Sequence, residues 1–177
     1  MPPESFSTER LTFRRPTLDD AEWIFQSYAS DPEVTRYLSW PLHRDISDTE
    51  TFLRRCEAVW TDRTAYPWVL ELKSTTTPIG MLEMRLRPPR ADVGYVLARS
   101  HWGKGLMTEA VQHVKAWALA QPEIHRFWAV CDVENVASRR VLEKCGLELE
   151  GILRNWESRP DSAGRACDCL CFAAVDQ

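Results

Sequence analysis

A loop with two glycines is the part of this sequence with the clearest chemical meaning. It spans residues 101–110 and places Gly103 and Gly105 between a strand-like segment and a helix-like segment that begins at Leu106. Backbone N–H groups at a helix start lack intrahelical partners and carry the positive end of the helix dipole. Glycine also lets a ligand approach the backbone closely. The pattern predicts an anion site, with a tight packing loop as the open alternative.

The common nucleotide-binding motifs are absent from the sequence. It contains neither G-x-x-x-x-G-K-[ST] nor G-x-G-x-x-G. The loop chemistry therefore indicates an anion without saying which one.

A single carboxylate marks the second place where chemistry is expected. Glu83 interrupts the apolar run of residues 79–84, and a carboxylate on a central strand needs a reason. We interpret Glu83 as a general base. A pair with Arg85, one step further on the same face, and simple solvent exposure are the structural alternatives. Asp92 is a poorer candidate because it begins its strand.

Length and composition restrict the class of protein. The chain has 177 residues, 44% hydrophobic and 27% charged, with a net charge of −4. We expect one domain over residues 1–177. The negative charge argues against a nucleic-acid binder. No apolar run could span a membrane and the start lacks signal-peptide features, so a cytoplasmic protein is expected.

The cysteines do not indicate a metal site. Cys167, Cys169 and Cys171 alternate in a strand-like segment, without C-x-x-C spacing or nearby histidines. We interpret them as small buried hydrophobic residues, and we expect no metal.

Hydrophobic periodicity indicates the elements that must position these residues. The pattern predicts a first helix capped by Thr17, an irregular stretch over 33–46, and a second helix starting at a capping box at Ser47. A central helix over 106–119 and a helix opened by Asn135 and stopped by Gly146 follow. Strands are expected at 8–16, 68–72, 79–86, 92–97, 126–131, 147–153 and 166–172. Short connections favour an antiparallel meander, with one parallel pair around the central helix.

Several stretches, in the same order, are similar to the GNAT acetyltransferases, and most of all to their RimJ/RimL branch, which modifies N-terminal amines of ribosomal proteins. Residues 94–97, 102–105 and 108–110 resemble the acetyl-CoA motif of that family. Further likenesses are found at residues 10–14 with 20–21, 34–38 with Trp40, 135–138 and 141–147. The resemblance implies an α/β fold with a mixed, mostly antiparallel sheet flanked by helices, whose parallel strand pair is splayed at the acetyl-CoA site.

The resemblance also implies roles for individual residues. Acetyl-CoA would be the cosubstrate, its pyrophosphate held by backbone N–H groups of the loop. Tyr37 and Trp40 would contact the acceptor. The cofactor-binding residues implied in this way are Tyr95, Val96, Leu97, Trp102, Gly103, Lys104, Gly105, Leu106, Met107, Thr108, Asn135 and Ser138.

Two positions depart from the family pattern. Met107 stands where a small residue is usual, so it would either crowd the phosphate or point into the core. Leu142 stands where the family often has a tyrosine acid, and Ser138 is the residue that this branch offers instead. A polar residue in the first turn of a helix capped by Asn135 is the open alternative for Ser138.

We therefore predict an acetyl-CoA-dependent N-acetyltransferase that acts on a primary amine, such as a protein N-terminus, by direct attack in a ternary complex. The strand backbone over 94–97 would polarise the thioester, Glu83 would accept the amine proton through water, and Ser138 would assist the thiolate. The alternatives are a small-molecule acceptor (aminoglycoside, polyamine or amino acid) and a CoA-binding module without turnover. The resemblance also suggests a homodimer.

Overall fold

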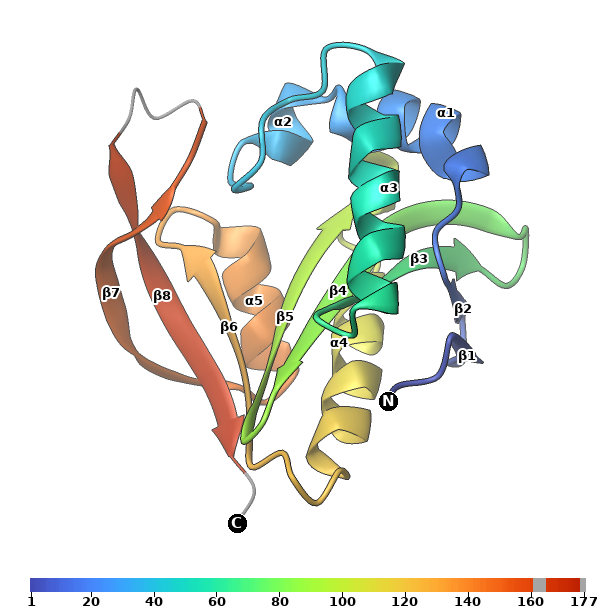
Figure 1. The fold of residues 1–177 in the computed structure, drawn as a ribbon. Helices are drawn as coiled ribbons and strands as arrows, with labels where there is room; N and C mark the ends of the chain where they lie inside the picture. Colours follow the sequence, from blue (N-terminus) through green and yellow to red (C-terminus); the bar gives the residue numbers. More distant parts are fainter. Residues whose placement is uncertain (161–164, 176–177) are drawn as a thin grey trace.

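The structure, a computed structural model, describes residues 1–160 and 165–175. In these residues, eight strands form one sheet in the order β1-β2-β3-β4-β5-β6-β8-β7, with helices on both faces (Figure 1). The strands are β1 (Ser5–Ser7), β2 (Leu11–Arg14), β3 (Tyr66–Leu72), β4 (Thr77–Arg87), β5 (Arg90–Leu97), β6 (Arg126–Asp132), β7 (Glu148–Ser158) and β8 (Ala166–Val175). The α-helices are α1 (Ala21–Ile24), α2 (Pro32–Thr35), α3 (Ile46–Thr61), α4 (Leu106–Leu119) and α5 (Val136–Lys144). A π-helical turn at Phe25–Ala29 and 3₁₀ turns at Leu18–Asp20 and Arg99–His101 complete the helical segments.

The sheet is antiparallel except at one pair of strands. β5 and β6, joined by α4, run parallel, as the sequence predicts. Their ladder covers only Arg90–Asp92 against Arg126–Trp128. Beyond these residues the two strands separate, and the sheet opens into two halves (Figure 1). The predicted mixed, mostly antiparallel fold with one splayed parallel pair is confirmed.

Helices bury both faces of the sheet. On β3, Trp68 and Leu70 belong to the core that includes α4, whereas Val69 belongs to the core formed with α1 and α3. Successive side chains of a strand point to opposite faces, so both sets are apolar. This packing holds β4 and β5 between α4 on one face and α3 on the other. Side chains of these two strands border the opening in the sheet.

The N-terminal third differs in detail from the sequence prediction. Asp45, not Ser47, caps α3, since its side chain accepts a hydrogen bond from the Ser47 N–H at 2.8 Å. The predicted capping box is therefore wrong. The stretch 33–46 is partly helical, because Asp31 caps α2 with Pro32 at its first position. The first strand is also shorter than expected and pairs with an additional strand, β1.

The C-terminal half follows the prediction more closely. α4 has the predicted bounds, α5 is capped by Asn135, and Gly146 follows it with φ +72°. The apolar pattern of the sequence places Ala137 on the inner face of α5, but the structure leaves it exposed. β7 and β8 form the predicted hairpin, with a bulge between Leu153 and Glu157. In the described residues, no helix is long and apolar enough to cross a membrane.

Candidate active site

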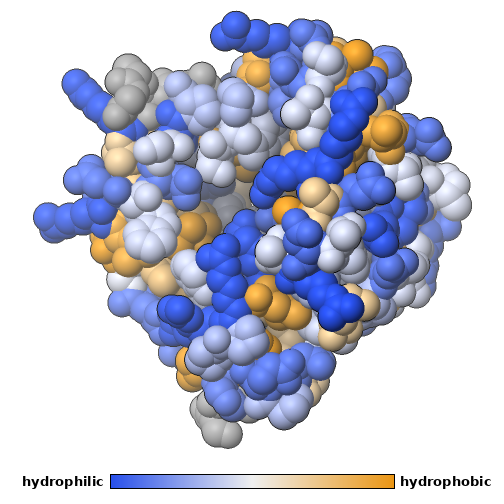
Figure 2. All heavy atoms as spheres, in the orientation of Figure 1, coloured by the Kyte–Doolittle hydropathy of each residue, from blue (hydrophilic) through white to orange (hydrophobic). Residues whose placement is uncertain are grey.

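A cavity of about 300 Å³ occupies the opening between the two halves of the sheet. Its walls come from the loop after α2, from α3, from β4 and β5 on one side, and from β6, α5, β7 and β8 on the other. Figure 2 shows this hollow in the middle of the molecular face, with hydrophilic side chains around its rim. β5 has no strand partner on this side beyond Asp92. In the rest of the strand, every second residue therefore directs its backbone N–H and C=O groups into the opening.

The two-glycine loop forms the start of α4. Gly103 and Gly105 both have φ +73°, in the left-handed region that glycine adopts without strain. The first helical hydrogen bond runs from the Glu109 N–H to the Gly105 carbonyl. The N–H groups of residues 106–108 precede this bond, so they can serve an anion as the sequence predicts.

Side chains from distant segments hold this loop in place. The Arg10 guanidinium donates to the Lys104 carbonyl at 2.9 Å and to the Glu109 carboxylate at 2.6 Å. The Trp102 indole N–H donates to the Leu97 carbonyl at 2.6 Å, which ties the loop to the end of β5. The loop is therefore held by Arg10, which directly precedes β2, and by the end of β5.

Met107 points into the core. Its side chain is 5% exposed and packs with Leu106 in the cluster between α4 and the sheet. Of the two orientations left open by the sequence, the structure selects the one that leaves the backbone N–H groups accessible. Leu142, at the position of the absent tyrosine, is also fully buried.

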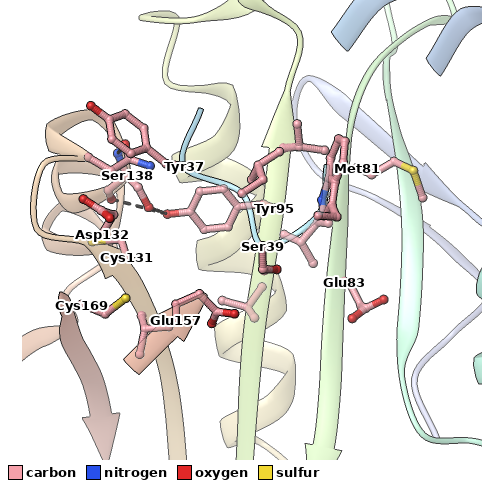
Figure 3. Close-up of a pocket in the computed structure, with 18 of the residues that line it drawn as sticks. Tyr37, Ser39, Met81, Glu83, Tyr95, Cys131, Asp132, Ser138, Glu157 and Cys169 are labelled. Atoms are coloured by element: carbon pink, nitrogen blue, oxygen red, sulfur yellow. Dashed lines mark hydrogen bonds between the residues drawn. The ribbon is translucent and has the colours of Figure 1, made fainter. Parts of the chain in front are cut away.

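Tyr95 and Ser138 meet across the opening. The Tyr95 hydroxyl lies 2.8 Å from the Ser138 Oγ (Figure 3). Ser138 is held in the first turn of α5 because the Asn135 side chain accepts its N–H at 3.0 Å. Burial raises the pKa of Tyr95 well above its ordinary value, so the hydroxyl stays protonated. All three residues line the cavity, and Val96 lines it beside them.

Glu83 reaches the cavity from β4, but it is not alone there. One carboxylate oxygen accepts from Arg85 at 2.9 Å, and the other lies 3.8 Å from the Arg55 guanidinium. Arg85 also pairs with Asp92. The ion pair that the sequence left open as an alternative is therefore present, and Glu83 nevertheless faces the cavity. Asp92 itself is 8% exposed.

The C-terminal hairpin contributes cavity residues that the sequence interpretation missed. Glu157 of β7 points into the cavity from the wall opposite β4 and makes no ion pair among the described residues (Figure 3). Arg159 crosses to Asp132 of β6 at 2.8 Å and lies over the Tyr37 ring. No local motif marks these positions, although the bulge in β7 is a feature that often accompanies sites.

The predicted acceptor residues line the cavity. Tyr37 and Trp40 both belong to its wall. Trp40 packs against His43 and Phe52, with ring centroids 5.1 and 6.5 Å apart. The loop after α2 is thus folded onto α3 and also faces the opening.

Comparison with known proteins decides the family. Residues 10–148 match the acetyltransferase (GNAT) domain family. The chain belongs to the GNAT acetyltransferases. The uncharacterized N-acetyltransferase p20 of Bacillus licheniformis is 32% identical to it over 175 residues, 97% of this chain and 96% of that protein. The protein is accordingly an acetyl-CoA-dependent N-acetyltransferase, and this sequence prediction is confirmed.

Solved structures share the fold of this GNAT chain. RimL, a ribosomal α-N-protein acetyltransferase, superposes with a TM-score of 0.86 at 21% identity, covering 98% of this chain and 94% of RimL. A microcin self-immunity acetyltransferase in complex with acetyl-CoA and AMP gives a TM-score of 0.85 at 23% identity, covering 96% of this chain and 94% of that protein.

The described residues hold no cluster of three or more His, Cys, Asp or Glu that could bind a metal ion.

Proposed function

We propose that the enzyme transfers the acetyl group of acetyl-CoA to the α-amine of a protein N-terminus by direct attack in a ternary complex. The observation that carries this proposal is the single cavity lined by Glu83 from one half of the splayed sheet and by Ser138 from the other. An amine beside Glu83 and a thioester beside Ser138 would share that space.

The proposed reaction uses these groups in order. N–H groups of residues 103–108 bind the CoA pyrophosphate, since the Trp102 N–H already donates to the Arg99 carbonyl, and the free edge of β5 along Tyr95, Val96 and Leu97 binds the thioester arm and polarises its carbonyl. The amine nitrogen attacks the carbonyl carbon while its proton passes through water to Glu83. The C–S bond then breaks, and the electron pair leaves on sulfur, which Ser138 stabilises.

The thiols in the cavity wall support direct attack rather than an acetyl-enzyme. Cys131 and Cys169 are 6% and 3% exposed, and burial raises their pKa to about 11 and about 12. Both stay protonated at neutral pH, and a protonated thiol is a poor nucleophile.

The charges of the cavity bear on the acceptor. Glu83 is paired with Arg85, and Asp132 is paired with Arg159, so Glu157 is the carboxylate that adds unpaired negative charge. Such a cavity suits one amine better than a polycationic drug. An α-amine has a pKa of about 7.7–8.0, against about 10.4 for lysine, so it needs less help from a base. The likeness to RimL points to a protein N-terminus.

A panel of acceptors tests the proposal. Peptides with free N-termini, the same peptides with blocked N-termini and internal lysines, free amino acids, spermidine and an aminoglycoside are incubated with acetyl-CoA. CoA release is followed by a thiol reagent, and the product by mass spectrometry. Acetylation confined to free N-termini supports the proposal. Turnover with a small amine alone would replace it with the small-molecule alternative.

Two matched substitutions test the base. Glu83→Gln should lower kcat about 10²-fold or more, because general bases contribute about 10²–10⁴-fold. Glu157→Gln changes a second cavity carboxylate, the one that forms no ion pair among the described residues. A larger loss of kcat in Glu157→Gln than in Glu83→Gln would transfer the base role to Glu157.

We also propose that residues 1–177 form one N-acetyltransferase domain that assembles as a homodimer. Size-exclusion chromatography with light scattering measures the mass of the protein in solution. A mass of 20.5 kDa, that of one chain, would exclude the dimer.

A further inference from the structure

The hydroxyl of Tyr95 has a contact that cofactor binding does not explain. Tyr95 belongs to β5, and its side chain spans the opening to reach Ser138 of α5 (Figure 3). There it meets Ser138 Oγ at 2.8 Å, inside the cavity. The ring needs no such partner to pack, because its body already lies against the core.

A serine hydroxyl has one hydrogen to donate and can accept from a second group. The Asn135 side chain is engaged by the Ser138 backbone N–H, not by its hydroxyl. If Tyr95 donates to Ser138 Oγ, the serine hydrogen is not used in this pair and can point either at the Cys131 thiol, with which Ser138 also forms a hydrogen bond, or at a ligand atom in the cavity. Ser138 also lies in the first turn of α5, where the helix dipole favours negative charge.

We propose that Tyr95 is a positioning residue that holds and polarises Ser138, so that the serine hydroxyl donates to the departing CoA sulfur. This inference rests on the proposed function, in which Ser138 faces the thioester. As the C–S bond breaks, negative charge grows on sulfur, and a hydrogen bond that strengthens with that charge accelerates the step. The sulfur leaves as thiolate and later takes its proton from water. No proton leaves Tyr95.

A double-mutant cycle tests this role. Ser138→Ala should lower kcat about 10²-fold, as for loss of one donor to a developing charge. Tyr95→Phe, which removes one oxygen and keeps the ring, should lower kcat about 5- to 10-fold, equivalent to about 1–1.4 kcal/mol. Because Tyr95 acts through Ser138, adding Tyr95→Phe to Ser138→Ala should cost less than 2-fold. The KM for acetyl-CoA should change little in all three.

Tyr28→Phe is the matched control, because the Tyr28 hydroxyl is buried, lies outside the cavity and has no hydrogen-bond partner among the residues that the structure describes. It should leave kcat unchanged. The assay uses whichever acceptor the wild-type chain acetylates. The inference would be overturned if Tyr95→Phe lowered kcat equally in the wild type and in Ser138→Ala. It would also be overturned if Tyr95→Phe raised the KM for acetyl-CoA and left kcat unchanged. Either result would leave the proposed function standing. Wild-type chain that acetylates no amine would refute the proposed function itself.

Discussion

Arg10 should support CoA binding without touching CoA. Its guanidinium joins the segment just before β2 to the two-glycine loop through the Lys104 carbonyl at 2.9 Å and the Glu109 carboxylate at 2.6 Å. Glu109 lies in the first turn of α4, beside the expected pyrophosphate site. Arg10→Ala would release the loop and leave a carboxylate without its cation near an incoming anion.

The structure sets the size of the effect. The Arg10 side chain is 45% exposed, which reduces the value of the ion pair, whereas Glu109 is 17% exposed. Exposed pairs contribute about 0.2–1 kcal/mol, so we expect a loss of about 1 kcal/mol in the free energy of unfolding. A similar loss in binding free energy corresponds to a CoA Kd about 5-fold higher.

The pH dependence gives a second measurement of the same contact. Burial raises the pKa of Glu109, but hydrogen bonds from Thr8 and Arg10 outweigh burial and leave that pKa lowered. A lowered carboxyl pKa stabilises the folded state above the unfolded value of about 4.3. This contribution is lost as the pH falls through the folded-state pKa. The difference between wild type and Arg10→Ala should therefore shrink in acid.

Calorimetric titration with CoA and urea unfolding at several pH values measure these effects. Arg54→Ala is the control, because Arg54 forms an exposed ion pair with Glu50 one turn away on α3. It should lose a few tenths of a kcal/mol at most and keep its CoA affinity. If Arg10→Ala binds CoA as tightly as Arg54→Ala does, the loop does not depend on its brace and the reasoning is refuted.

Three further substitutions test other parts of the structure. Gly105→Ala puts a side chain at φ +73°, which should cost about 1–2 kcal/mol in urea unfolding and raise the CoA Kd; unchanged values of both would contradict the left-handed start of α4. Met107→Ala should lose about 2–5 kcal/mol of stability without tighter CoA binding, and a gain in affinity would place Met107 at the phosphate after all. Burial lowers the pKa of His43, so the folded state binds fewer protons than the unfolded chain and stability should fall as the pH drops below about 6.5, by at most about 1.4 kcal/mol per pH unit. His43→Gln should flatten that slope, and an equally steep slope would exclude His43 as its source.

Local patterns in the sequence were sufficient for much of this fold. The apolar stripe of α4 gave its bounds, Asn135 and Gly146 gave those of α5, and the strand–helix–strand order gave the parallel pair. These features depend on periodicity, capping and handedness, which act over a few residues or one crossover. At Ser47 the same kind of reasoning failed, because Asp45 two residues earlier was an equally good cap and the chain used it.

The candidate site was recognisable from the sequence only as a set of residues. An interrupted apolar strand selected Glu83, the glycine spacing selected the loop, and similarity to a family selected Ser138. The chemistry of an amine and a thioester gave them their proposed roles. Packing decided what those side chains touch. Whether Glu83 would pair with Arg85 or stand alone could not be read from a spacing of two, since both outcomes use the same strand face.

By itself, therefore, the sequence determined the bounds of α4 and α5, most of the strands and the parallel pair, because these depend on neighbours along the chain or on a single crossover. Only the tertiary structure decided that Met107 turns inward, that Tyr95 reaches Ser138 across 43 residues of sequence, and that Glu157 enters the cavity. These contacts join segments that are far apart in the sequence and face each other across the opening where β5 and β6 diverge. No local sequence pattern specifies which side chains meet there.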